Sequence, residues 1–316
     1  MKNKIEALKK EISKQVIGHK EMIDSLLIGL LSEGHILIEG VPGLAKTTAV
    51  NALSKSLGLS FHRVQFTADL LPSDILGAEI YHTKTESFKL KKGPIFTHLL
   101  LADEINRASA KVQSALLEVM QEKQVTIGDE TFKLEEPFMV LATQNPIDQE
   151  GTYRLPEAQL DRFMFKIIVG YNTPDEEFEI AKKVASKSFA IIDEILSPSE
   201  LKVMKKEVER VYIDDALIAF IVKLIFATRN PKAHHGLEHL TQTIAFGASP
   251  RATIDLLKAV KASAYLRGKD VVTPIDIMLC VKNVLRHRIV LSYDALAKEI
   301  STDEVIEELM QTLEMP

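Results

Sequence analysis

The chain has 316 residues, of which 46% are hydrophobic and 26% charged, a composition typical of globular domains that excludes wholesale disorder. At about 100–150 residues per domain, this length suits one large fold with a satellite domain. Lys and Arg number 39 against 44 Asp and Glu, so the net charge of −5 argues against a protein that wraps duplex nucleic acid with a cationic surface.

Neither a membrane span nor a secretion signal is predicted. The longest apolar runs, 26–31 and 216–222, are far shorter than the ~20 residues that cross a bilayer. Residues 1–16 interleave Lys and Glu with apolar side chains, which indicates an amphipathic helix. The single cysteine, Cys280, lies in an apolar segment and is expected to be a buried small hydrophobe. We therefore expect a cytoplasmic protein.

The two parts of the chain differ in their patterns. The first ~170 residues alternate short apolar runs with amphipathic segments, which is typical of a parallel α/β sheet. The predicted strands are His35–Glu39, Phe61–Phe66, Thr97–Ala102, Phe138–Thr143 and Phe163–Val169. Helical periodicity then dominates, over 174–187, 199–210, 215–228, 250–266, 274–288 and 297–313. The sequence thus predicts an α/β core over 1–170 and an α-helical domain over 171–316.

Two segments interrupt this alternation. Residues 78–90 and 124–134 each show a rough period of two around a polar turn, which predicts β-hairpins inserted into the core.

The strongest chemical signal follows the first predicted strand. Glycines at 40 and 43 favour a tight loop whose N–H groups, with the start of the next helix, form an anion cradle. The candidate phosphate-binding residues are Gly40, Val41, Pro42, Gly43, Leu44, Ala45, Lys46, Thr47 and Thr48. Lys46 would reach the β- and γ-phosphates and Thr47 would offer its hydroxyl to Mg²⁺. Ala45 stands where the general motif has glycine, so an ordinary strand-to-helix turn is the alternative.

A second signal is the pair of carboxylates that ends the strand 97–102. In phosphoryl transfer the first acid, Asp103, would hold Mg²⁺ and the second, Glu104, would polarise the attacking water. His98, within the strand, is interpreted as a packed core residue. Together with the loop, this pair predicts nucleotide hydrolysis.

A third strand delivers Asn145 to the same edge, because the carboxyl ends of parallel strands meet at one crevice. Asn145 is a candidate to orient the lytic water. The alternative is an Asn-Pro turn that only closes the strand.

Several motifs in this order closely resemble those of the MoxR family of AAA+ ATPases, over essentially the whole chain. They are Val16-Ile17-Gly18, GVPGLAKTT (40–48), LLLADEINRA (99–108), VLATQNPIDQEGTYRLPEAQLDRF (140–163) and GASPRA (247–252). Alanine at position 45 fits this family's version of the loop. The hairpin at 78–90 resembles the insertion within the second helix, and that at 124–134 resembles the hairpin before the sensor strand.

The resemblance implies roles for further residues. Val16 and Ile17 would lie near the adenine, and Asn145 would be the first sensor. Arg162, in the helix before the last strand, would be the arginine finger offered to a neighbouring subunit, with a surface ion pair near Asp161 as the alternative. Arg107 and Arg154 are rival fingers.

Arg251 also has an independent argument. Ser249 and Pro250 predict the N-cap and first position of a helix, so Arg251 lies in a first turn where the dipole disfavours a cation by ~0.3–1 kcal/mol. A nucleotide phosphate across the cleft would compensate, which matches the family's second-sensor arginine in the helical lid. A solvent-facing arginine is the alternative.

A metal site at His234, His235 and His239 is disfavoured, because Pro231 and Gly236 break any helix there. We expect a loop.

The resemblance implies an AAA+ ATPase that forms a ring, expected to be a hexamer, and uses ATP and Mg²⁺ to remodel protein clients. The family resemblance also implies a partner with a von Willebrand factor A domain, on a separate polypeptide. A nucleic-acid motor is the main alternative, although the basic cluster of Lys84, Lys89, Lys91 and Lys92 is small. A non-hydrolysing nucleotide switch is disfavoured by Glu104.

Overall fold

The computed structural model describes residues 2–84, 86–146, 152–153, 155–186 and 190–316. A parallel five-stranded sheet, in the order β2-β5-β8-β1-β9, forms the centre of the N-terminal part. Its strands are β1 (Ile36–Glu39), β2 (Phe61–Gln65), β5 (Leu99–Asp103), β8 (Met139–Gln144) and β9 (Phe165–Ile168). The predicted fold class, an α/β core followed by helices, is confirmed, and each predicted strand is present with its ends shifted by at most two residues.

The inner strands β1, β5 and β8 are apolar because both faces of the sheet are covered there, whereas the edge strand β2 is polar and mostly exposed. Successive side chains of a strand point to opposite faces, so Ile36 and Ile38 join one apolar cluster and Leu37 joins the other. The helices around the sheet are α1 (Lys2–Ser13), α2 (Lys20–Leu31), α3 (Lys46–Ser56), α4 (Pro72–Leu76), η1 (Ile105–Arg107), α5 (Ala110–Glu122) and α6 (Glu157–Leu160). Side chains of α1, α2 and α3 belong to the first cluster, and those of α5 belong to the second.

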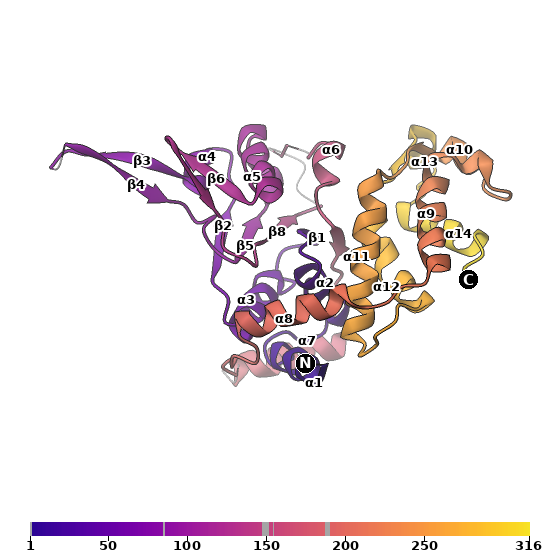
Figure 1. Ribbon diagram of the computed structural model, residues 1–316, viewed down its shortest axis with the longest axis horizontal. Coiled ribbons are helices and arrows are strands. Elements are labelled where there is room, and N and C mark those ends of the chain that lie inside the picture. Colours follow the sequence, from indigo (N-terminus) through magenta and orange to yellow (C-terminus); the bar gives the residue numbers. More distant parts are fainter. Residues whose placement is uncertain (1, 85, 147–151, 154, 187–189) are drawn as a thin grey trace.

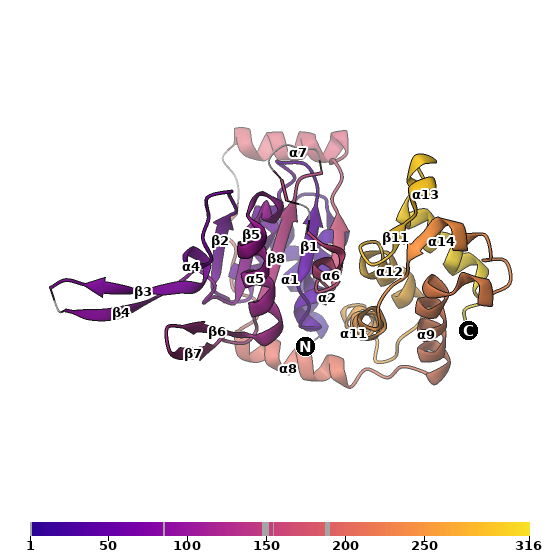
Figure 2. The ribbon, with the colours of Figure 1, turned by 90° about the horizontal axis from the view of Figure 1, so that it is seen from above.

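Both predicted hairpins are present. They consist of β3 (Gly77–His82) with β4 (Ser87–Lys92), and β6 (Gln124–Ile127) with β7 (Glu130–Lys133). The β3–β4 hairpin extends from the core on the side away from the helices of residues 215–312 (Figures 1 and 2).

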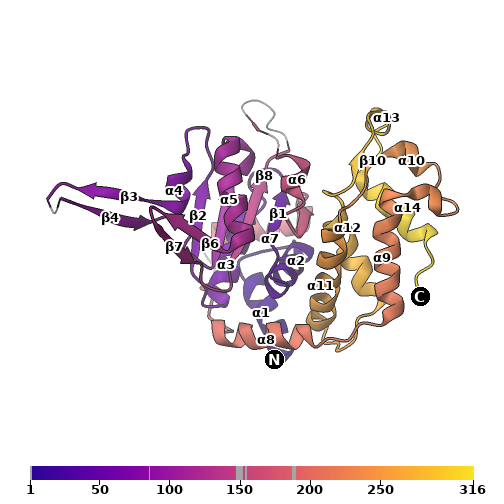
Figure 3. The same ribbon diagram turned by 45° about the horizontal axis from the view of Figure 1, so that its top comes forward.

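The C-terminal part is mostly helical, as its periodicity predicts. Its elements are α7 (Pro174–Ala185), α8 (Pro198–Glu209), α9 (Asp215–Arg229), η2 (Pro231–Ala233), α10 (Leu240–Thr243), β10 (Ile244–Phe246), α11 (Pro250–Leu266), α12 (Pro274–Leu285), β11 (Val290–Leu291), α13 (Tyr293–Ala297) and α14 (Thr302–Thr312). Helix α8 runs along the base of the core and contacts both α2 and α11 (Figure 3). One apolar cluster therefore continues from the core into the C-terminal helices.

The single helix predicted over 297–313 is wrong in one respect, because the chain turns between α13 and α14. Glu299 has a φ of 57°, and Ser301 caps α14 by accepting a hydrogen bond from the Glu304 amide while the Glu304 carboxylate accepts one from the Ser301 amide. This reciprocal capping begins a new helix at Thr302. No helix within the described ranges has both the length and the apolar character to cross a membrane.

Candidate active site

The phosphate loop lies between β1 and α3, and two of its residues show why its sequence is restricted. A Cβ atom at Gly40 would lie 2.8 Å from the Val169 carbonyl oxygen, so a larger residue cannot fit without displacing backbone. Ala45 has a φ of 53°, in the left-handed region that glycine adopts most easily. Ala45 therefore adopts the left-handed backbone conformation for which the glycine of the general motif is better suited.

A cavity of about 320 Å³ opens on this loop. Its lining combines the loop with residues at the carboxyl ends of neighbouring strands: Pro42, Gly43, Leu44, Ala45, Lys46, Thr47, Thr48, Arg63, Asp103, Glu104, Thr143 and Asn145. The strand order places β5 and β8 beside one another and β8 beside β1, which is why residues more than 100 positions apart share one cavity. The predicted acids, lysine and asparagine are thus brought together.

Lys46 is held inside the loop. Its ammonium Nζ donates a hydrogen bond of 2.5 Å to the Gly40 carbonyl oxygen. Burial lowers the pKa of Lys46, while the carboxylates of Asp103, Glu104 and Glu39 oppose that shift. A cation that is partly removed from water and has few direct partners is suited to bind an incoming anion.

Asp103 is bound by residues from both neighbouring strands. Arg63 on β2 donates from Nε (3.0 Å) and Nη2 (2.6 Å) to its Oδ2 atom, and the Thr143 hydroxyl on β8 donates to its Oδ1 atom. Charge-assisted hydrogen bonds of this kind are strong and directional. The carboxylate is therefore fixed at the floor of the cavity.

Glu104 lies directly after the strand with a φ of 56°, and its amide donates to the Thr143 hydroxyl. Its Oε2 atom accepts a hydrogen bond of 2.8 Å from Gln65 Nε2 and forms a 2.8 Å ion pair with Arg107 Nε. Both partners belong to the same chain. Arg107, a predicted rival finger, is therefore engaged with the chain's own Glu104 in this structure.

Arg162 and Arg251 lie together in a second cavity, of about 210 Å³. It is lined by His35, Met120, Gln121, Asp161, Arg162, Arg251, Ile254 and Asp255. His35 precedes β1 and Asp161 precedes β9, so this cavity lies at the amino ends of these strands, opposite the phosphate loop. A four-residue strand spans roughly 13 Å, and Arg251 is not part of the cavity at its own chain's loop.

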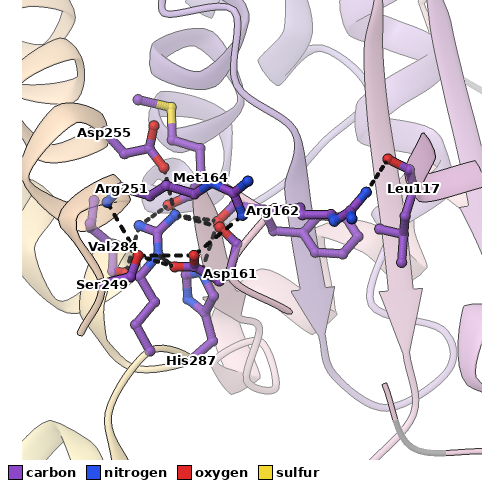
Figure 4. Close-up of polar contacts among 11 residues, drawn as sticks. Leu117, Asp161, Arg162, Met164, Ser249, Arg251, Asp255, Val284 and His287 are labelled. Carbon is purple, nitrogen blue, oxygen red and sulfur yellow. Dashed lines mark hydrogen bonds and ion pairs between the residues drawn. The ribbon is translucent and has the colours of Figure 1, made fainter. Parts of the chain in front are cut away.

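The surroundings of Arg162 differ from the expected helix position and from the alternative of an ion pair with Asp161. Helix α6 ends at Leu160, so Arg162 lies in the following turn and not within the helix. Its Nη1 atom donates to the Leu117 carbonyl oxygen at 2.9 Å, and its buried Nε atom has no partner among the described residues. Asp161 pairs instead with Arg288 and Arg251 (Figure 4).

The structure places the remaining candidates as follows. Val16 is 1% exposed within the core, and the neighbouring Ile17 carbonyl oxygen accepts a hydrogen bond from Asn172. Arg154 lies outside the described residues. His98 packs against Ser60, with 2.8 Å between its Nδ1 atom and the Ser60 hydroxyl.

The histidines of the 234–239 segment have separate contacts. The His234 ring packs edge-on against Phe226, His235 pairs with Glu238, and His239 lies 2.6 Å from a Glu308 carboxylate oxygen. The three rings therefore face different partners, and the buried Nε2 atom of His234 has no hydrogen-bond partner among the described residues.

Sequence reasoning missed four residues of these two cavities and their surroundings. They are Arg63, Gln65, Thr143 and Arg288. The first two had a signal in the sequence, because Arg63 and Gln65 stand two residues apart in a predicted strand and therefore share one face. No local pattern marks Arg288 as buried.

A glycine-containing loop between a strand and a helix, with Lys46 and the Asp103-Glu104 pair at the same sheet edge, defines a P-loop nucleotide-binding protein. The AAA family model (ATPase family associated with various cellular activities) matches residues 35–165, and the AAA lid domain model matches residues 238–309.

Individual proteins agree with this class. Chaperone MoxR1 of Mycobacterium tuberculosis is 47% identical over 97% of this chain and 81% of its own length. Protein MoxR of Paracoccus denitrificans is 32% identical over 88% of this chain and 86% of its own length. A crystal structure from Cytophaga hutchinsonii superposes with a TM-score of 0.94 at 49% identity, covering 100% of this chain and 96% of that one. The chain belongs to the MoxR family of AAA+ ATPases, and it is an ATP hydrolase.

Proposed function

We propose that the cavity at the phosphate loop binds ATP with Mg²⁺ and that hydrolysis there drives remodelling of client proteins. The observation that carries the catalytic part is the convergence of Lys46, Asp103, Glu104 and Asn145 on one cavity from separate strands. Lys46 and the backbone N–H groups of 40–48, other than Pro42, bind the phosphates, while Val16 and Ile17 lie toward the adenine.

The residues of the cavity fit a magnesium ion. The Thr47 hydroxyl and the Asp103 carboxylate line the same cavity, and hard oxygen ligands of this kind suit Mg²⁺, which also keeps several waters. When bound, the ion neutralises charge on the phosphate oxygens. Arg63, which now holds Asp103, has to give up part of its contact for this carboxylate to serve as a ligand.

Glu104 is proposed to accept a proton from the attacking water, and Asn145 to orient that water. Gln65 and Arg107 now occupy its Oε2 atom, and release of these contacts would free both carboxylate oxygens for this role. The arrangement described here is therefore assigned to a resting state of the site.

Arg162 and Arg251 are proposed to act on the nucleotide of a neighbouring copy. Their common cavity lies at the sheet edge opposite the phosphate loop, so a head-to-tail contact between copies is the arrangement that brings them to phosphates. Arg162 is the arginine finger and Arg251 the second sensor. We propose that this contact closes into a ring, and that the ring is a hexamer.

The remaining assignments follow from the family. We propose that residues 1–170 form the nucleotide-binding core and 171–316 the lid, and that the protein works in the cytoplasm, where ATP is supplied. The chaperone name of the mycobacterial relative supports protein clients. A separate protein with a von Willebrand factor A domain is the proposed partner.

The test of the site is complementation between two inactive variants. Lys46→Ala cannot bind phosphate but keeps its arginines, whereas Arg162→Ala keeps its own loop. Mixed rings of the two should recover part of the ATPase activity, because an Arg162→Ala site can use the finger of a Lys46→Ala neighbour. If rings shown to contain both variants recover no ATPase activity, the assignment of Arg162 to a neighbour's site is overturned.

The partner is tested separately, by the ATPase rate of the wild-type protein. A purified von Willebrand factor A domain protein should raise this rate, and DNA should not. Stimulation by DNA alone would favour a nucleic-acid motor instead.

A further inference from the structure

Besides the shared apolar cluster, a cluster of charged side chains links the described core and lid (Figure 4). The core contributes the turn before β9, which contains Asp161. The lid contributes Ser249, Arg251 and Asp255 from the start of α11, and Arg288 from just beyond α12. The cluster contains two guanidinium groups and two carboxylates, so its formal charges balance.

Arg288 is the fixed centre of this cluster. Its side chain is 0% exposed, its Nε atom donates to Asp161 Oδ1 at 2.9 Å, and its Nη2 atom donates to Asp255 Oδ2 at 2.5 Å. It also donates to the carbonyl oxygens of Phe163 (2.9 Å) and Val284 (3.1 Å). A buried cation with this many partners has no low-energy alternative position, because any movement leaves charges unpaired away from water.

Asp161 is shared between the fixed and the exposed parts of the cluster. Its carboxylate accepts hydrogen bonds from Arg288 Nε and from the Ser249 hydroxyl, at 3.0 Å and 2.9 Å for its two oxygens. The same carboxylate forms a longer contact, 3.4 Å, with Nη1 of Arg251. Arg251 is 49% exposed, so this last contact is weak and exchangeable in solvent.

The next residue along the chain is Arg162. Its guanidinium is directed to the Leu117 carbonyl oxygen, and both Arg162 and Arg251 line the 210 Å³ cavity. Any rotation of the lid relative to the core therefore displaces Arg251 relative to Arg162, unless Asp161 holds the start of α11 against the turn before β9.

We propose that Asp161 is a positioning residue that fixes the lid to the turn containing Arg162. Arg162 and Arg251 are then held in a fixed relative position when they contact the polyphosphate of a neighbouring copy. Arg288 and Asp255 hold Asp161 from the lid side. Asp161 itself does not touch the nucleotide. Its weak contact with Arg251 is exchanged for a phosphate contact when the neighbour docks, while the strong contacts with Arg288 and Ser249 remain.

This inference rests on the proposed action of both arginines in trans, and it makes a prediction about which subunit needs Asp161. In mixed rings of Lys46→Ala and Arg162→Ala subunits, the Lys46→Ala subunit only donates arginines and the Arg162→Ala subunit only hydrolyses. Asp161→Asn placed in the donor should lower kcat about 10- to 100-fold, as small displacements of catalytic groups do, with the KM for ATP unchanged. The same substitution in the hydrolysing subunit should change kcat by less than about twofold.

Three results would contradict the proposal in different ways. Equal losses in both placements, or a loss only in the hydrolysing subunit, would show that Asp161 acts on its own chain's site or only on stability. Absence of activity in the parent mixture would instead refute the trans assignment on which this inference rests. Full activity with Asp161→Asn in the donor would show that positioning does not depend on this carboxylate.

Matched variants control for folding. Asp294→Asn makes the same chemical change at an exposed position on α13 and should leave kcat unchanged in either subunit. If Asp161→Asn does not fold, Asp255→Asn carries the same placement test, because it loosens Arg288 from the other side without touching Arg251. Asp255→Asn should also lower kcat only when it is in the donor subunit. An equal loss of kcat in either subunit would contradict the proposal.

Discussion

The Arg63 guanidinium on β2 donates two hydrogen bonds to a single carboxylate oxygen of Asp103 on β5. The two residues lie 40 positions apart in sequence, and they meet because β2 pairs with β5 in parallel, with Gln65 opposite Asp103. This contact occupies the carboxylate that we propose as a ligand of Mg²⁺. Mg²⁺ and Arg63 therefore compete for the Asp103 carboxylate.

Arg63→Gln should lower the magnesium concentration needed for half-maximal ATPase activity. Because partly exposed ion pairs contribute ~0.2–1 kcal/mol, the decrease should be at most about fivefold. A magnesium titration of the steady-state rate measures it, with Arg63→Lys, which keeps a cation beside Asp103, as the control. An unchanged or higher magnesium requirement would show that Asp103 and Arg63 do not compete in this way.

Lys46→Ala and Glu104→Gln should both abolish turnover, but at different steps. Lys46→Ala removes a phosphate contact and should lose ATP binding, whereas Glu104→Gln should bind ATP and lose ~10²–10⁴-fold in kcat, since it lacks only the base. Equilibrium binding of a fluorescent ATP analogue, measured beside the hydrolysis rate, separates them. Wild-type hydrolysis by Glu104→Gln would rule out the base assignment.

Arg251→Ala and Arg288→Ala should differ strongly in their effect on stability, although both arginines contact Asp161. Arg251 is half exposed, so its loss should change the free energy of unfolding by less than about 1 kcal/mol while reducing ATPase activity. Arg288 is fully buried, and its loss should cost about 3–5 kcal/mol. Urea unfolding without nucleotide gives both values. A large stability loss in Arg251→Ala would identify it as a structural arginine.

Stability should fall as the pH is lowered from about 6.5 toward 4, partly because of His35. Its Nδ1 atom accepts from the Val140 amide and its Nε2 atom faces the Met120 carbonyl oxygen. Burial, opposed by the Met120 contact, lowers the pKa of His35 to about 4. The unfolded chain then binds a proton between pH 6.5 and 4 that the folded chain does not, which favours unfolding by up to about 3 kcal/mol.

The measurement is the pH dependence of the unfolding free energy, compared between wild type and His35→Gln. Burial also lowers the pKa of His287, so this second histidine contributes to the same slope, and His287→Gln is the matched variant. Each substitution should flatten the slope by its own share. An unaltered slope in His35→Gln would mean that His35 titrates normally in the folded protein.

Local sequence was sufficient wherever the structure depends on neighbouring residues. The phosphate loop could be predicted because a glycine-containing turn followed by Lys46 and Thr47 determines its own backbone conformation. The start of α11 could be predicted for the same reason. The Ser249 side chain accepts a hydrogen bond from the Arg251 amide, and Pro250 occupies the first helical position. Asp103 and Glu104 were recognisable because an apolar strand has no packing reason to end in two acids.

Only the tertiary structure decided which of these residues meet. The sequence predicted that a cation in the first turn of α11 needs compensation, but the group that provides it here is Asp161, 90 positions earlier. Likewise Arg63 reaches Asp103, and Arg288 reaches Asp161, through the order in which strands and helices pack. Local hydrogen bonding and side-chain periodicity determine individual elements, whereas a buried ion pair depends on the relative placement of two elements, which is settled by how their apolar faces fit together.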